Sequence, residues 1–150
     1  MFMLDTNAFN CAFDSDIDPK LLSRRGPLFV THIQLNELQA TKRTERLNQL
    51  LAVFTSVDQE TIPTAAAVWG VSEWGGAEYG SAGGVYDAML VSLNKRNGSK
   101  DNNAQDVLIA VTAYKHGYTL VTDDSDLSIV LRQIGGIAET FEEFCHQSRY

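Results

Sequence analysis

The chain has 150 residues, a net charge of −7 and a sequence pI of about 4.8. This length fits one domain over residues 1–150, large enough to bury a core without disulfides or a structural metal. The apolar fraction of 44% and charged fraction of 21% exclude a disordered or fibrous chain. No stretch approaches the roughly 20 apolar residues of a membrane span. Because the N-terminus lacks the basic and apolar segments of a signal peptide, we expect a soluble, cytoplasmic protein.

In the first half of the chain, short apolar runs alternate with segments of helical periodicity. Asp5 stands at the carboxyl end of the first run, and Glu37 lies in the helix that follows the second. The predicted elements are strand Met1–Asp5, helix Asn7–Phe13, strand Pro27–Thr31, a helix capped by Thr31 that carries Ile33, Leu35, Glu37 and Leu38, and helix Thr44–Phe54.

The second half continues this alternation after a glycine-rich stretch between Gly75 and Gly84. Residues Asp101–Asn103 are expected to cap the helix that carries Asp106. The predicted elements are an Ala-rich helix from Thr64 through Trp69 and Trp74, helix Val85–Lys95, the Asp106 helix closing at His116-Gly117, strand Tyr118–Thr122, a helical turn Leu127–Arg132, strand Gly136–Glu139 and a terminal acidic helix. Strands that alternate with amphipathic helices predict a central, mainly parallel sheet in a three-layer α/β/α domain.

Four carboxylates are positioned to meet at one edge of such a sheet. Ligands of open parallel sheets bind beyond the carboxyl ends of the strands. Asp5 ends the first strand, and Asp124 follows the strand Tyr118–Thr122. Glu37 and Asp106 lie in helices that can project to the same edge, and Asp106 lies near the positive end of its helix dipole.

Each of these residues taken alone is better explained by local structure. Asp5, Asp123 and Asp124 suit turns, Asp106 suits a helix start, and Glu37 suits a solvated helix face. Together, however, four converging carboxylates would repel one another and raise one another's pKa. A divalent cation removes that penalty, and Mg²⁺ suits a site of carboxylates, waters and substrate phosphates.

Such a site predicts phosphodiester hydrolysis. One or two metal ions can activate a water and stabilise the attacking and leaving oxygens of an in-line displacement. Attack by water rather than by a ribose 2′-hydroxyl would leave a 5′-phosphate and a 3′-hydroxyl. The three histidines, His32, His116 and His146, have no metal-binding spacing, so we expect them to be structural or exposed.

Four segments resemble those of PIN-domain ribonucleases, and most closely the VapC-type toxins of toxin–antitoxin pairs. The segments are Met3-Leu4-Asp5-Thr6-Asn7, Thr31-His32-Ile33-Gln34-Leu35-Asn36-Glu37-Leu38, Asp106-Val107-Leu108-Ile109-Ala110-Val111-Thr112-Ala113 and Leu120-Val121-Thr122-Asp123-Asp124. Each segment is weak alone, but their order and approximate spacing match over nearly the whole chain.

The resemblance implies a Mg²⁺- or Mn²⁺-dependent endoribonuclease, frequently a homodimer, that is inhibited by a basic antitoxin protein. It also implies roles for individual residues. Expected catalytic residues are Asp5, Glu37, Asp106 and Asp124; expected metal ligands are Asp5, Asp106 and Asp124; and expected supporting residues are Thr6, Asn7, Thr122 and Asp123.

The acidic charge makes RNA an unusual substrate, because phosphate neutralisation by basic patches supplies most of the affinity of nucleic-acid binders. Bound metal ions or a basic partner protein would reconcile the two. The competing hypothesis is a PIN-like domain that binds RNA or a protein without cutting. Several apolar residues could line a groove that binds an antitoxin, although such residues more often belong to the core. They are Leu47, Leu50, Leu51, Trp69 and Trp74.

Two further patterns carry no predicted chemistry. Asp14, Asp16 and Asp18 imitate the start of a calcium loop, but Pro19 occupies the position of its glycine, so we interpret the segment as a solvated loop. Cys11 and Cys145 form no CxxC pair, and a disulfide between them is possible only if the two ends of the chain meet.

Overall fold

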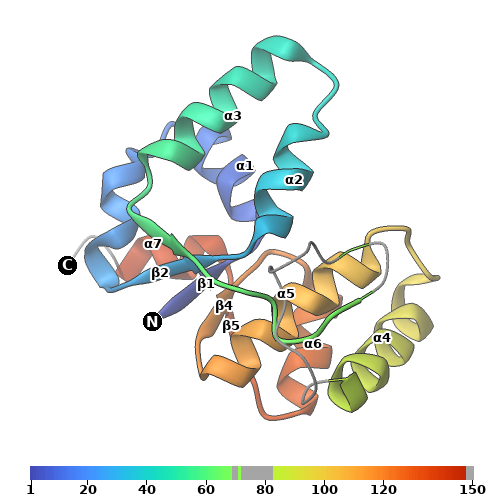
Figure 1. Ribbon diagram of the computed structural model, residues 1–150. Coiled ribbons are helices and arrows are strands. Elements are labelled where there is room, and N and C mark those ends of the chain that lie inside the picture. Colours follow the sequence, from blue (N-terminus) through green and yellow to red (C-terminus); the bar gives the residue numbers. More distant parts are fainter. Residues whose placement is uncertain (69–70, 72–82, 148–150) are drawn as a thin grey trace.

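A computed structural model describes residues 1–68, 71 and 83–147 (Figure 1). Five parallel strands form one sheet in the order β3-β2-β1-β4-β5. The strands are β1 (Phe2–Leu4), β2 (Leu28–Val30), β3 (Gln59–Thr61), β4 (Thr119–Val121) and β5 (Ile137–Glu139). Helices cover both faces of the sheet, so the predicted three-layer α/β/α fold is confirmed.

The α-helices lie close to their predicted positions, whereas the 3-10 helix η1 (Pro19–Arg25) was not predicted from the sequence. They are α1 (Thr6–Asp14), the 3-10 helix η1 (Pro19–Arg25), α2 (His32–Gln39), α3 (Thr44–Ser56), α4 (Gly83–Asn97), α5 (Asn103–His116), α6 (Ser125–Gln133) and α7 (Phe141–Gln147). Thr31 caps α2 as predicted, and Gln34 completes a capping box with it. Gly117 ends α5 in the left-handed conformation, with φ of 68°, which glycine adopts without steric cost.

The sheet separates two hydrophobic clusters because successive residues of a strand point to opposite faces. Met3 and Leu120 face the cluster formed with α4, α5 and α6. Phe2 and Leu4 face the cluster formed with α1, α3 and α7. Figure 1 shows these two helical layers on either side of the strands. The central strands β1 and β2 are therefore buried on both faces, so side chains that could bind a ligand lie at the strand ends.

Residues 59–68 differ from the prediction. Gln59–Thr61 form the edge strand β3, which apolar periodicity could not indicate because none of its residues is buried. Thr64–Val68 are not helical, so the predicted helix start at Thr64 is wrong. The Ala65 amide instead donates a hydrogen bond of 3.0 Å to Thr112 Oγ1 of α5. The remainder of that predicted helix, including Trp69 and Trp74, lies outside the described residues.

The leucines of α3 do not form an exposed apolar stripe. Leu50 is buried, whereas Leu47 and Leu51 are half-buried. The tryptophans proposed to share a groove with them lie outside the described residues. None of the helices in the described ranges has both the length and the apolar character of a bilayer-spanning segment.

Candidate functional site

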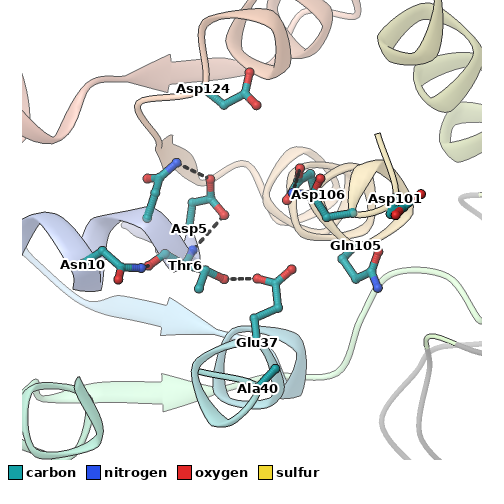
Figure 2. Close-up of a pocket in the computed structure, with 11 residues that line it drawn as sticks. Asp5, Thr6, Asn10, Glu37, Ala40, Asp101, Gln105, Asp106 and Asp124 are labelled. Atoms are coloured by element: carbon teal, nitrogen blue, oxygen red, sulfur yellow. Dashed lines mark hydrogen bonds between the residues drawn. The ribbon is translucent and has the colours of Figure 1, made fainter. Parts of the chain in front are cut away.

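A pocket of about 500 Å³ lies beyond the carboxyl ends of β1 and β4 (Figure 2). We call it the acidic pocket. It brings together the four carboxylates selected from the sequence and contains no lysine or arginine among its described lining residues. Its lining consists of Asp5, Thr6, Asn7, Asn10, Glu37, Ala40, Asp101, Asn102, Gln105, Asp106 and Asp124.

Asp5 follows β1 directly and is also the N-cap of α1. Its carboxylate is 3% exposed and accepts three hydrogen bonds. Oδ1 accepts from the Thr6 amide at 2.7 Å, whereas Oδ2 accepts from Asn7 Nδ2 at 2.9 Å and Thr122 Oγ1 at 2.6 Å. Asp5 was interpreted locally as a turn residue after a strand; it is instead the N-cap of α1, and these bonds also fix its carboxylate at the pocket wall.

Thr122 connects Asp5 to Asp124. Its buried hydroxyl donates to Asp5 and accepts from the Asp124 amide at 3.1 Å and from Asn7 Nδ2 at 3.1 Å. Asp124 Oδ1 in turn accepts from the Leu127 amide at 2.9 Å and caps α6. The expected supporting residues Asn7 and Thr122 thus position the carboxylates of the β1 and β4 ends relative to each other.

Glu37 reaches the acidic pocket from α2. The Thr6 hydroxyl donates a hydrogen bond to Glu37 Oε2, and Figure 2 shows the two side chains meeting across the pocket floor. Thr6 therefore contacts two of the four acids, Asp5 through its amide and Glu37 through its hydroxyl.

Asp106 enters the acidic pocket from the first turn of α5 and is 8% exposed. Its Oδ2 accepts a hydrogen bond of 2.8 Å from Asn102 Nδ2. Asn102 occupies the N-cap position of α5, but its side chain makes no capping hydrogen bond. The prediction that the segment Asp101–Asn103 caps this helix is therefore confirmed for the position of Asn102, whose side-chain amide binds the Asp106 carboxylate and not the helix backbone.

Asp123 lies outside the acidic pocket. It is exposed, its Oδ1 accepts from the Phe141 amide at 2.9 Å, and the Cys11 thiol donates to its Oδ2 at 3.1 Å. A separate pocket, the thiol pocket, contains this group together with the other cysteine; its lining is Cys11, Ser15, Ile17, Asp123, Phe141, Glu142, Cys145 and His146. No disulfide joins the two cysteines. The two ends of the chain do meet, but Asp123 contributes no side chain to the four-carboxylate cluster.

Burial and mutual repulsion raise the pKa of three carboxyl groups in the acidic pocket. Burial is the largest cause for Asp106, followed by the charges of Asp5, Glu37 and Asp124, and together they raise its pKa from 3.8 to about 8. The charge of Lys100 opposes this shift without cancelling it.

The same causes act on the other two groups. Burial raises the pKa of Asp5 even though hydrogen bonds from Thr122 and the Thr6 amide favour its charged form. Burial, together with the Asp5 charge, raises the pKa of Glu37 against the hydrogen bond from Thr6. The protein alone thus disfavours the fully ionised pocket, and a bound cation would favour it.

The donor set suits a hard divalent cation. The pocket offers carboxylate, amide and hydroxyl oxygens, and no sulfur or imidazole is among its described lining residues. In residues 1–68, 71 and 83–147, no three acidic, histidine or cysteine side chains are grouped closely enough to hold an ion by themselves. Mg²⁺ does not need such a cage, because it typically binds one or two carboxylates and completes its shell with waters and substrate phosphates.

Besides Ala40, four polar lining residues were not predicted as site residues. Asn102 and Asp101 were interpreted only as helix caps, and Asn10 and Gln105 were not singled out. Spacing offered a signal for two of them: Asn102 precedes Asp106 by one helical turn, and Asn10 follows Thr6 by one turn, so each pair shares a helix face.

The fold matches a solved structure over its full length. PAE2754 from Pyrobaculum aerophilum superposes with a TM-score of 0.59 at 16% identity, covering 99% of this chain and 96% of that chain. The fold is PIN-like. FitAcB from Neisseria gonorrhoeae is similar with a TM-score of 0.47 at 15% identity, covering 95% of this chain and 99% of its own. FitAB bound to the IR36 DNA fragment gives 0.49 at 16% identity, with coverages of 94% and 95%.

No protein-family model and no curated protein sequence matches this chain. The likeness to PAE2754 shows the PIN-like fold and leaves the chemistry to be argued from the residues of this chain.

Proposed function

We propose that this protein is a Mg²⁺- or Mn²⁺-dependent endoribonuclease that hydrolyses RNA phosphodiesters in the acidic pocket. One observation carries the proposal: Asp5, Glu37, Asp106 and Asp124 come from four separate parts of the chain and line a single pocket. Burial and repulsion raise the pKa of three of them, so the cluster is destabilising unless a cation neutralises it.

Within this proposal, Asp5, Asp106 and Asp124 would hold the cation together with waters and substrate phosphates, because they are not grouped closely enough to hold it by themselves. Thr122 and Asn7 orient Asp5 through the hydrogen bonds described above, and Asn102 orients Asp106. When bound, the cation neutralises the carboxylates, activates a water and stabilises charge on the phosphate. Glu37 is suited to accept a proton from the attacking water, because burial raises its pKa and makes it a stronger base than an exposed carboxylate.

The choice of RNA rests on the resemblance of four sequence segments to PIN-domain ribonucleases. The structure is consistent with that resemblance, because each of the four segments supplies one carboxylate of the acidic pocket. Because no lysine or arginine is among the described lining residues, a bound cation would supply the positive charge that attracts the phosphate.

Cleavage of a single-stranded RNA in Mg²⁺ or Mn²⁺ buffer, with EDTA as control, tests the proposal. We expect fragments with 5′-phosphate and 3′-hydroxyl ends from the wild-type protein. Asp5→Asn and Asp106→Asn should be inactive and folded. Equal cleavage by mutant and wild type would contradict the proposal and indicate a contaminating nuclease.

We also propose that the enzyme is the toxin of a type II toxin–antitoxin pair and acts as a homodimer. The same resemblance supports this, and a basic antitoxin would complement the net charge of −7. Expression should arrest cell growth, and co-expression of the neighbouring open reading frame should relieve the arrest. Unaffected growth would contradict the toxin role, and a monomer in light scattering would contradict the dimer.

A second candidate is a PIN-like domain that binds RNA or a protein without cutting. It is favoured by the lack of any preassembled three-ligand group in the described part of the chain. RNA retention on a filter without cleavage in either metal would support this alternative over the nuclease.

A further inference from the structure

A second pocket of about 260 Å³ adjoins the acidic pocket between α2 and α5. We call it the amide pocket. It shares Glu37, Ala40 and Gln105 with the acidic pocket, and its other lining residues are Ile33, Asn36 and Val71. Because the two pockets have these three lining residues in common, they lie next to each other.

Gln105 lines both pockets, and its side-chain oxygen lacks a hydrogen-bond partner among the described residues. It immediately precedes Asp106 in α5, and Figure 2 shows both side chains projecting from that helix. Its Oε1 is buried and has no hydrogen-bond partner among the described residues. An unsatisfied buried acceptor is costly, and native structures contain few of them. A ligand that donates a hydrogen bond here would remove that cost.

The remaining lining suits a flat, partly apolar group. Ile33 is 2% exposed, and it faces the pocket together with Val71. Val71 is held in place by its amide, which donates to Val68 O at 3.1 Å, and by its carbonyl, which lies 3.3 Å from His32 Nε2. The volume of about 260 Å³ is slightly below the ~300 Å³ at which sites for drug-sized ligands begin, so it accommodates one ring system rather than a larger ligand.

We infer that the amide pocket binds the nucleobase next to the scissile phosphate and that Gln105 reads the edge of this base. This inference rests on the proposed ribonuclease function and adds its sequence specificity. A glutamine amide offers an acceptor and two donors, and a half-turn about its last bond exchanges them. The base edge with which such an amide typically pairs through two hydrogen bonds is that of adenine, so adenine is the expected base.

A cleavage assay on RNA randomised at the positions around one cut site tests this. Gln105→Leu keeps the size of the side chain and removes its hydrogen bonds, and Gln133→Leu, at an exposed position of α6, is the matched control. Wild type and control should prefer adenine at one flanking position, and Gln105→Leu should lower that preference about 5- to 100-fold. An unchanged preference in Gln105→Leu would overturn the inference, whereas the absence of cleavage by every variant would overturn the proposed nuclease.

A binding measurement separates the inference from catalysis. Titration of ¹⁵N-labelled protein with adenosine, guanosine, cytidine and uridine 5′-monophosphates in Mg²⁺ should shift the Gln105 side-chain amide signal most for adenosine. Gln105→Asn retains the amide but shortens the side chain, and it should weaken adenosine monophosphate binding while Gln133→Asn does not. Equal shifts for all four nucleotides, or no shift at Gln105, would overturn the inference even if RNA is cleaved.

Discussion

Asp123 and Asp124 are neighbours in the sequence, but their carboxylates belong to two pockets with different electrostatics. In the thiol pocket, the Asp123 carboxylate accepts hydrogen bonds from the Phe141 amide and the Cys11 thiol. In the acidic pocket, Asp124 lies with four other carboxylates, and its charge helps to raise the pKa of Asp106. The Asp123 carboxylate binds α7 and Cys11, whereas the Asp124 carboxylate caps α6 and lines a pocket with other acids. Residue type alone therefore does not identify a functional carboxylate; its partners do.

The largest expected effect is on RNA cleavage, which should depend on the acidic pocket and not on the thiol pocket. Asp5→Asn and Asp106→Asn should each lower the metal-dependent RNA cleavage rate by more than about 100-fold, because loss of a ligand should exceed the ~10–100-fold cost of losing a supporting residue. Asp123→Asn should cleave within a few-fold of wild type, because its side chain lies outside the acidic pocket. A comparable loss in Asp123→Asn, measured as initial rates, would contradict the distinction between the pockets.

The supporting hydrogen bonds give the next effect. Thr122→Val removes the hydroxyl that donates to Asp5 Oδ2 at 2.6 Å and accepts from the Asp124 amide. Cleavage should fall about 10–100-fold, and the midpoint of a Mg²⁺ titration of the rate should rise. Thr122→Ser keeps the hydroxyl and serves as the control. Similar rates for the valine and serine variants would show that the hydroxyl does not support the site.

Stability of the metal-free protein should depend on pH in a direction set by Asp106. Its pKa is about 8 in the folded protein and 3.8 ordinarily, so the folded state holds the proton more tightly than the unfolded state. The free energy of unfolding contributed by this group is therefore highest below pH 3.8 and declines as pH rises to about 8. Burial also raises the pKa of Asp5 and Glu37, which adds to the decline.

Chemical denaturation in EDTA measures this decline. At pH 8, Asp106→Asn should be more stable than wild type by about 1 kcal/mol or more, since one pKa unit corresponds to about 1.4 kcal/mol. At pH 4 the advantage should disappear. Saturating Mg²⁺ should stabilise the wild-type protein more than the variant. If the wild-type protein in EDTA instead became more stable relative to Asp106→Asn between pH 4 and pH 8, the claim that these carboxylates repel one another would be contradicted.

The smallest effect belongs to the thiol pocket. Asp123→Ala removes the acceptor of the first backbone amide of α7, and the unfolding free energy should fall by about 1 kcal/mol. Burial, followed by the hydrogen bond and charge of Asp123, raises the pKa of the Cys11 thiol to about 12. The variant should therefore alkylate faster at Cys11 at pH 8, with Asp124→Ala as the control. Equal alkylation rates in the two variants and wild type would show that Asp123 does not restrain the thiol.

The sequence predicted those parts of the site that follow from strand and helix periodicity. Asp5 and Asp124 were found because each follows a short apolar run, and Glu37 because Thr31 is a recognisable helix cap. Asn102 and Gln105 were missed as site residues because amides are common at helix starts, and only the packed structure shows which group they face. Strand β3 was missed for a related reason, since an exposed edge strand need not contain buried apolar residues.

Binding of Mn²⁺ to the metal-free protein, followed at pH 8 by the electron paramagnetic resonance signal of the free ion, tests the central claim most directly. The account predicts saturable binding to wild type and Asp123→Asn, with marked weakening in Asp5→Asn and Asp106→Asn. Failure of the wild-type protein to bind Mn²⁺, or equal binding by all four proteins, would contradict it.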